Sequence, residues 1–161
     1  MIDFLDGIQQ LLDSFSPEEV AVTREVFQRL LRGEATRPET LPSALGMPPA
    51  VVETAVARLV ERGTLARDPE TGQLIGARGL SLAETPHRLA IDGRQLYAFC
   101  AVDVVGIPAA FALNARVTSR CHACGRPLAL TLTNGAVTEA PPGVVVWAAE
   151  RDLTRPLHTY T

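Results

Sequence analysis

The sequence has 161 residues, of which 47% are hydrophobic and 20% are charged. This length fits one domain or two small ones, and the composition is that of a globular protein rather than a disordered chain. The formal net charge is −3, and all 15 basic residues are arginine. The charge argues against a strongly basic nucleic-acid or membrane-surface binder, and the absence of lysine excludes a lysine Schiff base or a P-loop lysine.

The N-terminus and the cysteine content are those expected of a cytoplasmic protein. Asp3, Asp6 and Asp13 stand where a signal peptide would carry basic residues. The three cysteines are an odd number, which fits reduced thiols better than a disulfide framework. No apolar run approaches the roughly 20 residues that span a bilayer. The sequence therefore predicts a cytoplasmic location and no membrane partner.

Helix signals dominate the first 80 residues. Ser16-Pro17-Glu18-Glu19 is a capping sequence, and Gly33, Gly46 and Gly63 are each placed to end a helix. The expected elements are helices over 2–15, 17–32, 41–45 and 49–62, then a hairpin of strands 65–67 and 74–75. The last three of these helices followed by the hairpin predict a winged helix-turn-helix over residues 1–80.

The charge of this region argues against DNA binding. Residues 1–80 contain 12 acidic residues and 8 arginines, which gives a net charge of −4. The helix over 49–62, which would enter the major groove, balances two glutamates against two arginines. Because basic contacts to phosphate supply most non-specific affinity, we expect a scaffold or dimerisation region and no DNA partner.

Strands are expected after residue 80, where we place a boundary between a region over 1–80 and a core over 81–161. The expected elements are a strand over 88–91, a helix over 94–106 that Pro108 ends or kinks, and strands over 115–121, 127–133, 136–139 and 143–149. Asn134-Gly135 is a hairpin turn signal. The predicted fold class is α+β: a winged-helix-like helical region followed by a small, mostly antiparallel sheet with a packed helix.

Cys100 and Asp103 are the residues most suited to chemistry. They are three apart on the expected helix, so their side chains should share a face, with Tyr97 one turn earlier. Apolar neighbours disfavour a charged carboxylate, so Asp103 should tend to hold its proton. A thiol is a soft nucleophile and a soft metal ligand. The thiol could therefore bind a soft electrophile next to a proton donor. A buried structural cysteine followed by a surface aspartate would have the same spacing, so both interpretations stay open.

Cys121-His122-Ala123-Cys124 forms a C-x-x-C pair. A structural zinc site normally needs four ligands, and only one such pair is present. The residues that could complete a set are Cys100, His87, His122 and His158. A redox dithiol of the thioredoxin type needs a helix after its first cysteine, whereas a strand is expected from Pro127. A zinc site, a redox pair and a plain turn that carries cysteines all stay open.

Several segments resemble the core of the alkylmercury (organomercurial) lyase family. They are Thr85–Leu89, Asp92–Asp103, Ile107–Ala109, Ala115–Cys121 and Gly125–Thr131. The resemblance covers about residues 80–147, and the preceding winged-helix-like region matches the family in architecture. It implies a lyase that cleaves carbon–mercury bonds by protonolysis, converting R–Hg⁺ to R–H and Hg²⁺.

The resemblance also implies roles for individual residues. Cys100 corresponds to the first catalytic cysteine and binds mercury, Asp103 carries the proton and can also bind the metal, and Cys121 corresponds to a buried structural cysteine. The family has a second catalytic cysteine after the last core strand, whereas no cysteine follows Cys124 here. A truncated or divergent member is therefore expected, in which Cys124 is a candidate substitute ligand.

The resemblance implies no organic cofactor, because mercury is substrate and product. An external thiol or a mercuric reductase would take up the Hg²⁺. A second hypothesis is a non-catalytic protein that binds or senses a soft metal through Cys100, Cys121 and Cys124, with the winged-helix-like region binding a partner. Release of a hydrocarbon from an organomercurial would favour the enzyme, and stoichiometric metal with a DNA mobility shift would favour the sensor.

Overall fold

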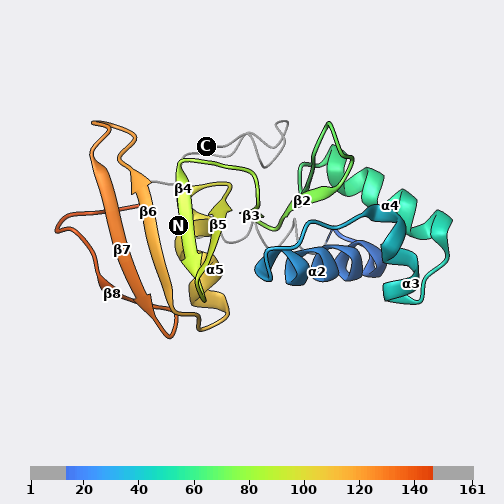
Figure 1. The fold of residues 1–161 in the computed structure, drawn as a ribbon, viewed down its shortest axis with the longest axis horizontal. Coiled ribbons are helices and arrows are strands. Elements are labelled where there is room, and N and C mark those ends of the chain that lie inside the picture. Colours follow the sequence, from blue (N-terminus) through green and yellow to red (C-terminus); the bar gives the residue numbers. More distant parts are fainter. Residues whose placement is uncertain (1–13, 147–161) are drawn as a thin grey trace.

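A computed structural model describes residues 14–146 as one antiparallel sheet with helices packed around it (Figure 1). The elements in chain order are α2 (Pro17–Leu31), η1 (Pro38–Thr40), α3 (Leu41–Leu45), α4 (Pro49–Glu61), β1 (Leu65–Arg67), β2 (Leu74–Ala77), β3 (Leu80–Ser81), β4 (His87–Ile91), β5 (Arg94–Ala98), α5 (Ala101–Ala110), β6 (Ala115–Arg120), β7 (Pro127–Thr133) and β8 (Ala136–Glu139). The expected helix over 2–15 and His158 lie largely or wholly outside this range. No helix within the range is long and apolar enough to cross a membrane.

The helix boundaries follow from local capping. The Ser16 hydroxyl accepts a hydrogen bond from the backbone N–H of Glu19 at 3.2 Å, and the Glu19 carboxylate accepts one from the backbone N–H of Ser16 at 2.9 Å. This capping box begins α2, as predicted. Gly46 and Gly63 adopt the left-handed conformation that ends α3 and follows α4. The predicted hairpin is also present as β1 and β2.

Within residues 14–146, the sheet has eight antiparallel strands in the order β1-β2-β3-β5-β4-β6-β7-β8. It is larger than the small sheet that was expected, because β3 joins the N-terminal hairpin to β5 without a break. The sheet is therefore continuous across residue 80. The division of the chain into two parts stays a prediction.

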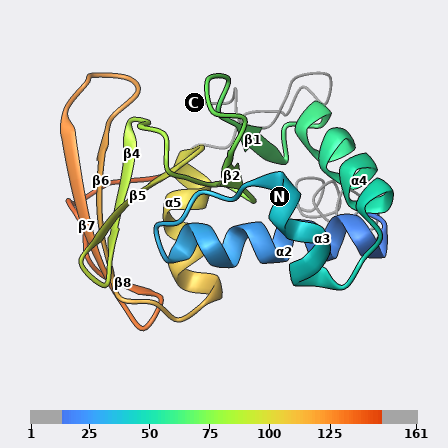
Figure 2. The same ribbon diagram turned by 45° about the vertical axis from the view of Figure 1, so that its right-hand side comes forward.

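The helices and the sheet share a single hydrophobic core. Leu89, Leu96 and Val117 lie opposite one another on β4, β5 and β6 and are completely buried. Helix α5 packs on these three strands, and α2 packs between α4 and β2. Figures 1 and 2 show α2 reaching from the α3–α4 end toward α5. There Phe27 stacks on Phe111 with ring centroids 5.3 Å apart, which links the helical region to α5.

The predicted helix over 94–106 is wrong in its first part. Residues 94–98 form β5, which pairs with β4 through the Asp92-Gly93 turn. Leu96 and Ala98 are buried on one face, and this two-residue period is too short to distinguish from a helical pattern by sequence alone. Tyr97 therefore lies on a strand and not on a helix face with Cys100. Pro108 lies inside α5, which ends two residues later.

The remaining strands match their predicted ranges with one exception. β6, β7 and β8 occupy the expected segments, and Asn134-Gly135 forms the turn between the last two with φ values of 49° and 78°. The strand expected over 143–149 is wrong in the part that the structure describes. Residues 143–146 are not in a strand, and Gly143 lies in a turn with φ of 73°.

Candidate functional site

Cys100 and Asp103 meet at the N-terminus of α5. Cys100 is the N-cap residue, with an extended backbone at φ −148° and ψ 173°, and Asp103 is the third residue of the helix. The Cys100 thiol donates a hydrogen bond to Asp103 Oδ2, with a sulfur–oxygen distance of 3.1 Å. The predicted proximity is confirmed, but it arises from the helix cap and not from a shared helix face.

The surroundings of Cys100 hold its proton on sulfur. Burial is the largest cause and the negative charge of Asp103 the next, and together they raise the pKa of the thiol to about 11. The backbone N–H groups of Asp103 and Val102 point toward the sulfur and act in the opposite direction. The thiol is therefore neutral near pH 7, while its cap position offers two donors to a thiolate once the proton has moved.

The β2–β3 hairpin forms one wall of this site. Gly79 has φ of +86°, and a Cβ placed there would lie 2.3 Å from Cγ of Asp103. The backbone N–H of Phe99 donates to the carbonyl of Gly79 at 2.8 Å, which fixes the residue before Cys100 to the same turn. Only a residue without a side chain leaves the Asp103 carboxylate its place.

A second glycine of the hairpin makes room for the Phe99 ring. A Cβ at Gly76 would lie 2.8 Å from Cζ of Phe99. Sequence reasoning missed Gly76 and Gly79, because both precede the boundary placed near residue 80. The Arg78-Gly79 pair between two apolar segments was the available signal for this turn.

Arg78 ties the same turn to α2. Its backbone has φ of 50°, and its guanidinium Nη2 donates to Thr23 Oγ1 at 2.8 Å. The side chain of Asp103 thus rests on a turn that a helix of the N-terminal half holds in place. The N-terminal region therefore contributes to the geometry of the site.

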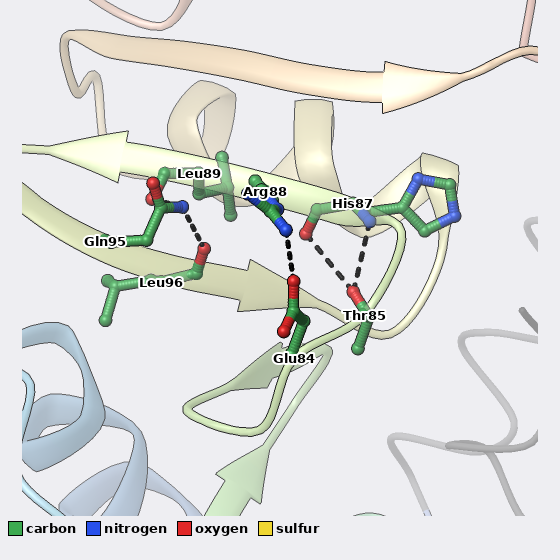
Figure 3. A network of polar contacts seen from close by, with 7 residues as sticks. All are labelled: Glu84, Thr85, His87, Arg88, Leu89, Gln95 and Leu96. Atoms are coloured by element: carbon green, nitrogen blue, oxygen red, sulfur yellow. Dashed lines mark hydrogen bonds and ion pairs between the residues drawn. The ribbon is translucent and has the colours of Figure 1, made fainter. Parts of the chain in front are cut away.

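Hydrogen bonds at the start of β4 connect it to the preceding segment and to β5 (Figure 3). The Thr85 hydroxyl lies 2.7 Å from the carbonyl oxygen of Ala98, two residues before Cys100, and accepts from the backbone N–H of His87 at 3.1 Å. Arg88 forms an ion pair with Glu84 beside it. His87 Nδ1 lies 2.8 Å from Ser119 Oγ on β6, so this histidine has a structural partner.

The C-x-x-C segment forms a tight turn between β6 and β7. The backbone N–H of Cys121 donates to the carbonyl of Arg126, and that of Gly125 donates to the carbonyl of Cys121, both at 2.8 Å. Cys121 is half-exposed and Cys124 is exposed, so the burial implied for Cys121 is wrong. Hydrogen bonds from the backbone N–H groups of Cys124 and Ala123, and then from the Cys124 thiol, lower the pKa of Cys121.

The candidate metal ligands do not assemble into one larger cluster. Within residues 14–146, no three His, Cys, Asp or Glu side chains are grouped so that they could hold a metal ion. Cys124 therefore does not join Cys100 and Asp103, and the four-ligand zinc site considered from the sequence is not formed by these residues. The site consists of two separate pairs, Cys100 with Asp103 and Cys121 with Cys124.

Comparisons with known proteins show which sequences and structures this chain is similar to. An alkylmercury lyase of Pseudomonas putida is 40% identical over 127 residues, which cover 78% of this chain and 58% of the relative. One of Streptomyces lividans is 35% identical over 128 residues, covering 76% and 55%. The crystal structure of the mercury-bound form of MerB2 matches with a TM-score of 0.85 and 28% identity, covering 92% of this chain and 72% of that one.

The matched residues cover most of this chain but only part of each relative. The chain spans little more than half the length of the curated relatives named above, at 58% and 55%. Residues 80–160 match the family described as alkylmercury lyase, a segment that includes both the Cys100–Asp103 pair and the Cys121–Cys124 pair. This match over half of the chain, together with the two relatives and the similar fold, shows that the chain belongs to the alkylmercury lyase family.

Proposed function

We propose that this chain cleaves carbon–mercury bonds by protonolysis, with Cys100 as the mercury ligand and Asp103 as the proton carrier. The supporting observation is the 3.1 Å hydrogen bond from the Cys100 sulfur to Asp103 Oδ2. It joins a soft metal ligand to a proton acceptor in one contact. Membership of the alkylmercury lyase family supports the same chemistry.

In the first step, the substrate R–Hg–X exchanges its ligand X for the Cys100 sulfur. The Hg–X bond breaks, the Hg–S bond forms, and the thiol proton moves to the Asp103 carboxylate with which it is already hydrogen-bonded. Metal binding to a thiol with a pKa of about 11 requires such an acceptor near pH 7. The products of the step are Cys100–S–Hg–R, a neutral Asp103 carboxylic acid and X⁻.

In the second step, the Asp103 carboxylic acid donates this proton to the carbon bonded to mercury. The C–Hg bond breaks, R–H leaves, and the aspartate is again a carboxylate beside a positively charged Cys100–S–Hg. The Asp103 oxygen or an external thiolate then supplies the second ligand of the metal. Both steps balance without an organic cofactor, and an external thiol or a mercuric reductase would remove the Hg²⁺.

A single-turnover assay tests this function. The chain is mixed with phenylmercuric acetate and an excess of a monothiol, and benzene is quantified. We expect about one benzene per chain from the wild type and only the background rate from Cys100→Ser, because a hydroxyl is a poor ligand for a soft metal. Absence of benzene from the wild type, or equal benzene from both, would contradict the proposal.

We also propose that α2, α3, α4 and the β1–β2 hairpin form a winged-helix-like scaffold that binds no DNA in a cytoplasmic protein. The order of these elements and the net charge of −4 over residues 1–80 support this role. The three free cysteines are consistent with a reducing compartment. A mobility shift that survives competitor DNA and weakens steeply with salt would contradict the scaffold role.

The soft-metal sensor is the less supported alternative. It requires Cys100, Cys121 and Cys124 to act together, whereas no group of three such ligands occurs in the part of the chain that the structure describes.

A further inference from the structure

The proposed reaction uses one thiol and leaves the other two thiols of the chain without a role. This pair lies in the thiol turn, which we define as Cys121–Gly125 between β6 and β7. The backbone N–H of Gly125 donates to the carbonyl of Cys121 at 2.8 Å, which closes one tight turn and places both cysteines on it. Both residues are accessible to solvent: Cys121 is half-exposed and Cys124 is exposed.

We propose that the thiol turn is a separate binding site for inorganic Hg²⁺, the product of the reaction, and that it discriminates against the organomercurial substrate. The proposal rests on the proposed function only for the origin of the Hg²⁺. The site itself is formed by two adjacent cysteine side chains on a closed turn.

The number of ligands selects the class of metal. A structural zinc site takes four ligands, and no third His, Cys, Asp or Glu is grouped with this pair within residues 14–146. Thiolates favour soft cations, and Hg²⁺ forms stable complexes with only two thiolates in a near-linear arrangement. Two sulfur atoms with no further ligand therefore suit Hg²⁺ better than zinc.

The number of strong ligand positions left on the metal also distinguishes the product, Hg²⁺, from the substrate, R–Hg⁺. In R–Hg⁺ the carbon already occupies one of the two strong positions of the metal, so only one sulfur can bind strongly. Hg²⁺ has both positions free and can be held by Cys121 and Cys124 together. The second sulfur then binds at the high effective concentration of a neighbouring group, so a free monothiol displaces a chelated Hg²⁺ far less readily than a singly bound R–Hg⁺.

The closed turn prepares the sulfur atoms for this exchange. The backbone N–H groups of Ala123 and Cys124 point toward the Cys121 sulfur. Gly125 has φ of +69° and closes the turn through its hydrogen bond to the Cys121 carbonyl. Binding replaces two S–H bonds by two S–Hg bonds and releases two protons to water, with no change of oxidation state.

The thiol turn lies at the same end of the sheet as the catalytic pair. Ala98 at the end of β5 pairs with His87 at the start of β4, and the His87 ring contacts Ser119 near the end of β6. Cys100 lies two residues after Ala98, and Cys121 lies two residues after Ser119. Mercury that leaves Cys100 thus emerges at the sheet end that carries the turn.

The test is a retention experiment with reduced, oxygen-free protein. Cys100→Ser, which keeps the turn intact, is loaded with either HgCl₂ or phenylmercuric acetate in excess 2-mercaptoethanol. Bound mercury is then measured by native mass spectrometry. We expect one Hg²⁺ per chain from HgCl₂ and no retained phenylmercury.

Second variants in the Cys100→Ser background locate the site. We expect Cys121→Ser and Cys124→Ser each to lower the competitive affinity for Hg²⁺ by at least about 100-fold, because chelation is lost. His122→Ala, a matched change within the same turn, should retain the metal. Loss of Hg²⁺ in His122→Ala alone, or retention in both serine variants, would overturn the assignment to two sulfur atoms.

The outcomes also separate this proposal from the lyase function. Retention of Hg²⁺ by Cys100→Ser with no benzene from the wild type would support the turn site and contradict the lyase. Benzene from the wild type with no Hg²⁺ retained by Cys100→Ser would support the lyase and overturn the turn site. Equal retention of phenylmercury and Hg²⁺ at the turn would overturn the discrimination.

Discussion

Cys100 and Cys121 are the same residue type in similar places, each beyond the end of a strand, yet their pKa values shift in opposite directions. Burial and the Asp103 carboxylate raise the pKa of Cys100 to about 11. Backbone N–H groups and the Cys124 thiol lower the pKa of Cys121. The hydrogen-bond partner and the access of water decide what each sulfur can do.

In the two proposals above, this difference divides two tasks between the two thiols. Cys100 keeps its proton next to a carboxylate, so a bound metal and a transferable proton would arise together at one position. Among the interactions of Cys121 within residues 14–146 that shift its pKa, none is with a carboxylate, so Cys121 would hold a metal without moving a proton to carbon. The following experiments test this division, beginning with the largest expected effect.

Removal of the Cys100 sulfur should abolish substrate binding at the catalytic pair. In a Cys121→Ser/Cys124→Ser background Cys100 is the only thiol of the chain, and we expect one equivalent of a chromophoric mercurial to bind. Adding Cys100→Ser should reduce binding to the background level, because a hydroxyl is a hard and poor ligand. An unchanged stoichiometry in the triple variant would show that mercury binds elsewhere.

Loss of the Asp103 carboxylate should separate binding from cleavage. We expect Asp103→Ala to lower the single-turnover rate of benzene formation by about 10²–10⁴, the usual contribution of general acid–base catalysis. The stoichiometry of mercury on Cys100 should remain one, since a carboxylate is a weak ligand for a soft metal. Equal rates in wild type and variant would exclude Asp103 as the proton carrier.

The opposite pKa shifts should appear in the pH dependence of alkylation. At pH 8, we expect iodoacetamide to modify Cys121 at least about tenfold faster than Cys100, although the greater nucleophilicity of a more basic thiolate offsets part of the gap. Peptide mass spectrometry gives both rates in one sample. Asp103→Asn should lower the alkylation midpoint of Cys100, because it removes the negative charge that helps to raise the pKa.

The raised pKa of Cys100 also determines how the stability of the folded protein should change with pH. Folding raises the pKa of Cys100 from 9.0 to about 11, so the folded state favours the neutral thiol. Its contribution to stability is complete below about pH 9 and is lost as the pH rises through about 11. A Cys100→Ser variant should therefore lose less stability than the wild type between these pH values, and an identical loss would contradict the shift.

The smallest expected effect comes from a substitution at Gly79, which packs against the Asp103 carboxylate. Gly79→Ala should displace the carboxylate, slow benzene formation severalfold and lower the pKa of Cys100, because the new Cβ would lie 2.3 Å from Asp103 Cγ. Gly93→Ala is the matched control, with φ of +75° and no atom within 4 Å of the new Cβ. Both should cost about 1 kcal/mol in backbone strain. A similar change in Cys100 alkylation in both variants would exclude a specific role for Gly79.

Local signals in the sequence were sufficient for much of the fold. The capping box at Ser16, the left-handed Gly46 and the Asn134-Gly135 turn act within a few residues, so each could be predicted without knowledge of the rest of the chain. The extended segment 94–98 could not, because its alternation is short and its strand identity comes from pairing with β4.

The catalytic pair shows the same division between local and tertiary information. The spacing of Cys100 and Asp103 by itself brings their side chains together, since a helix N-cap and the third helical residue are neighbours as surely as two residues on one helix face. The sequence thus determined which two side chains meet. Only the tertiary structure decided their environment, because Gly79 and Phe99 meet through the pairing of β3 with β5, and the burial that raises the Cys100 pKa exists only when distant segments exclude water from the sulfur.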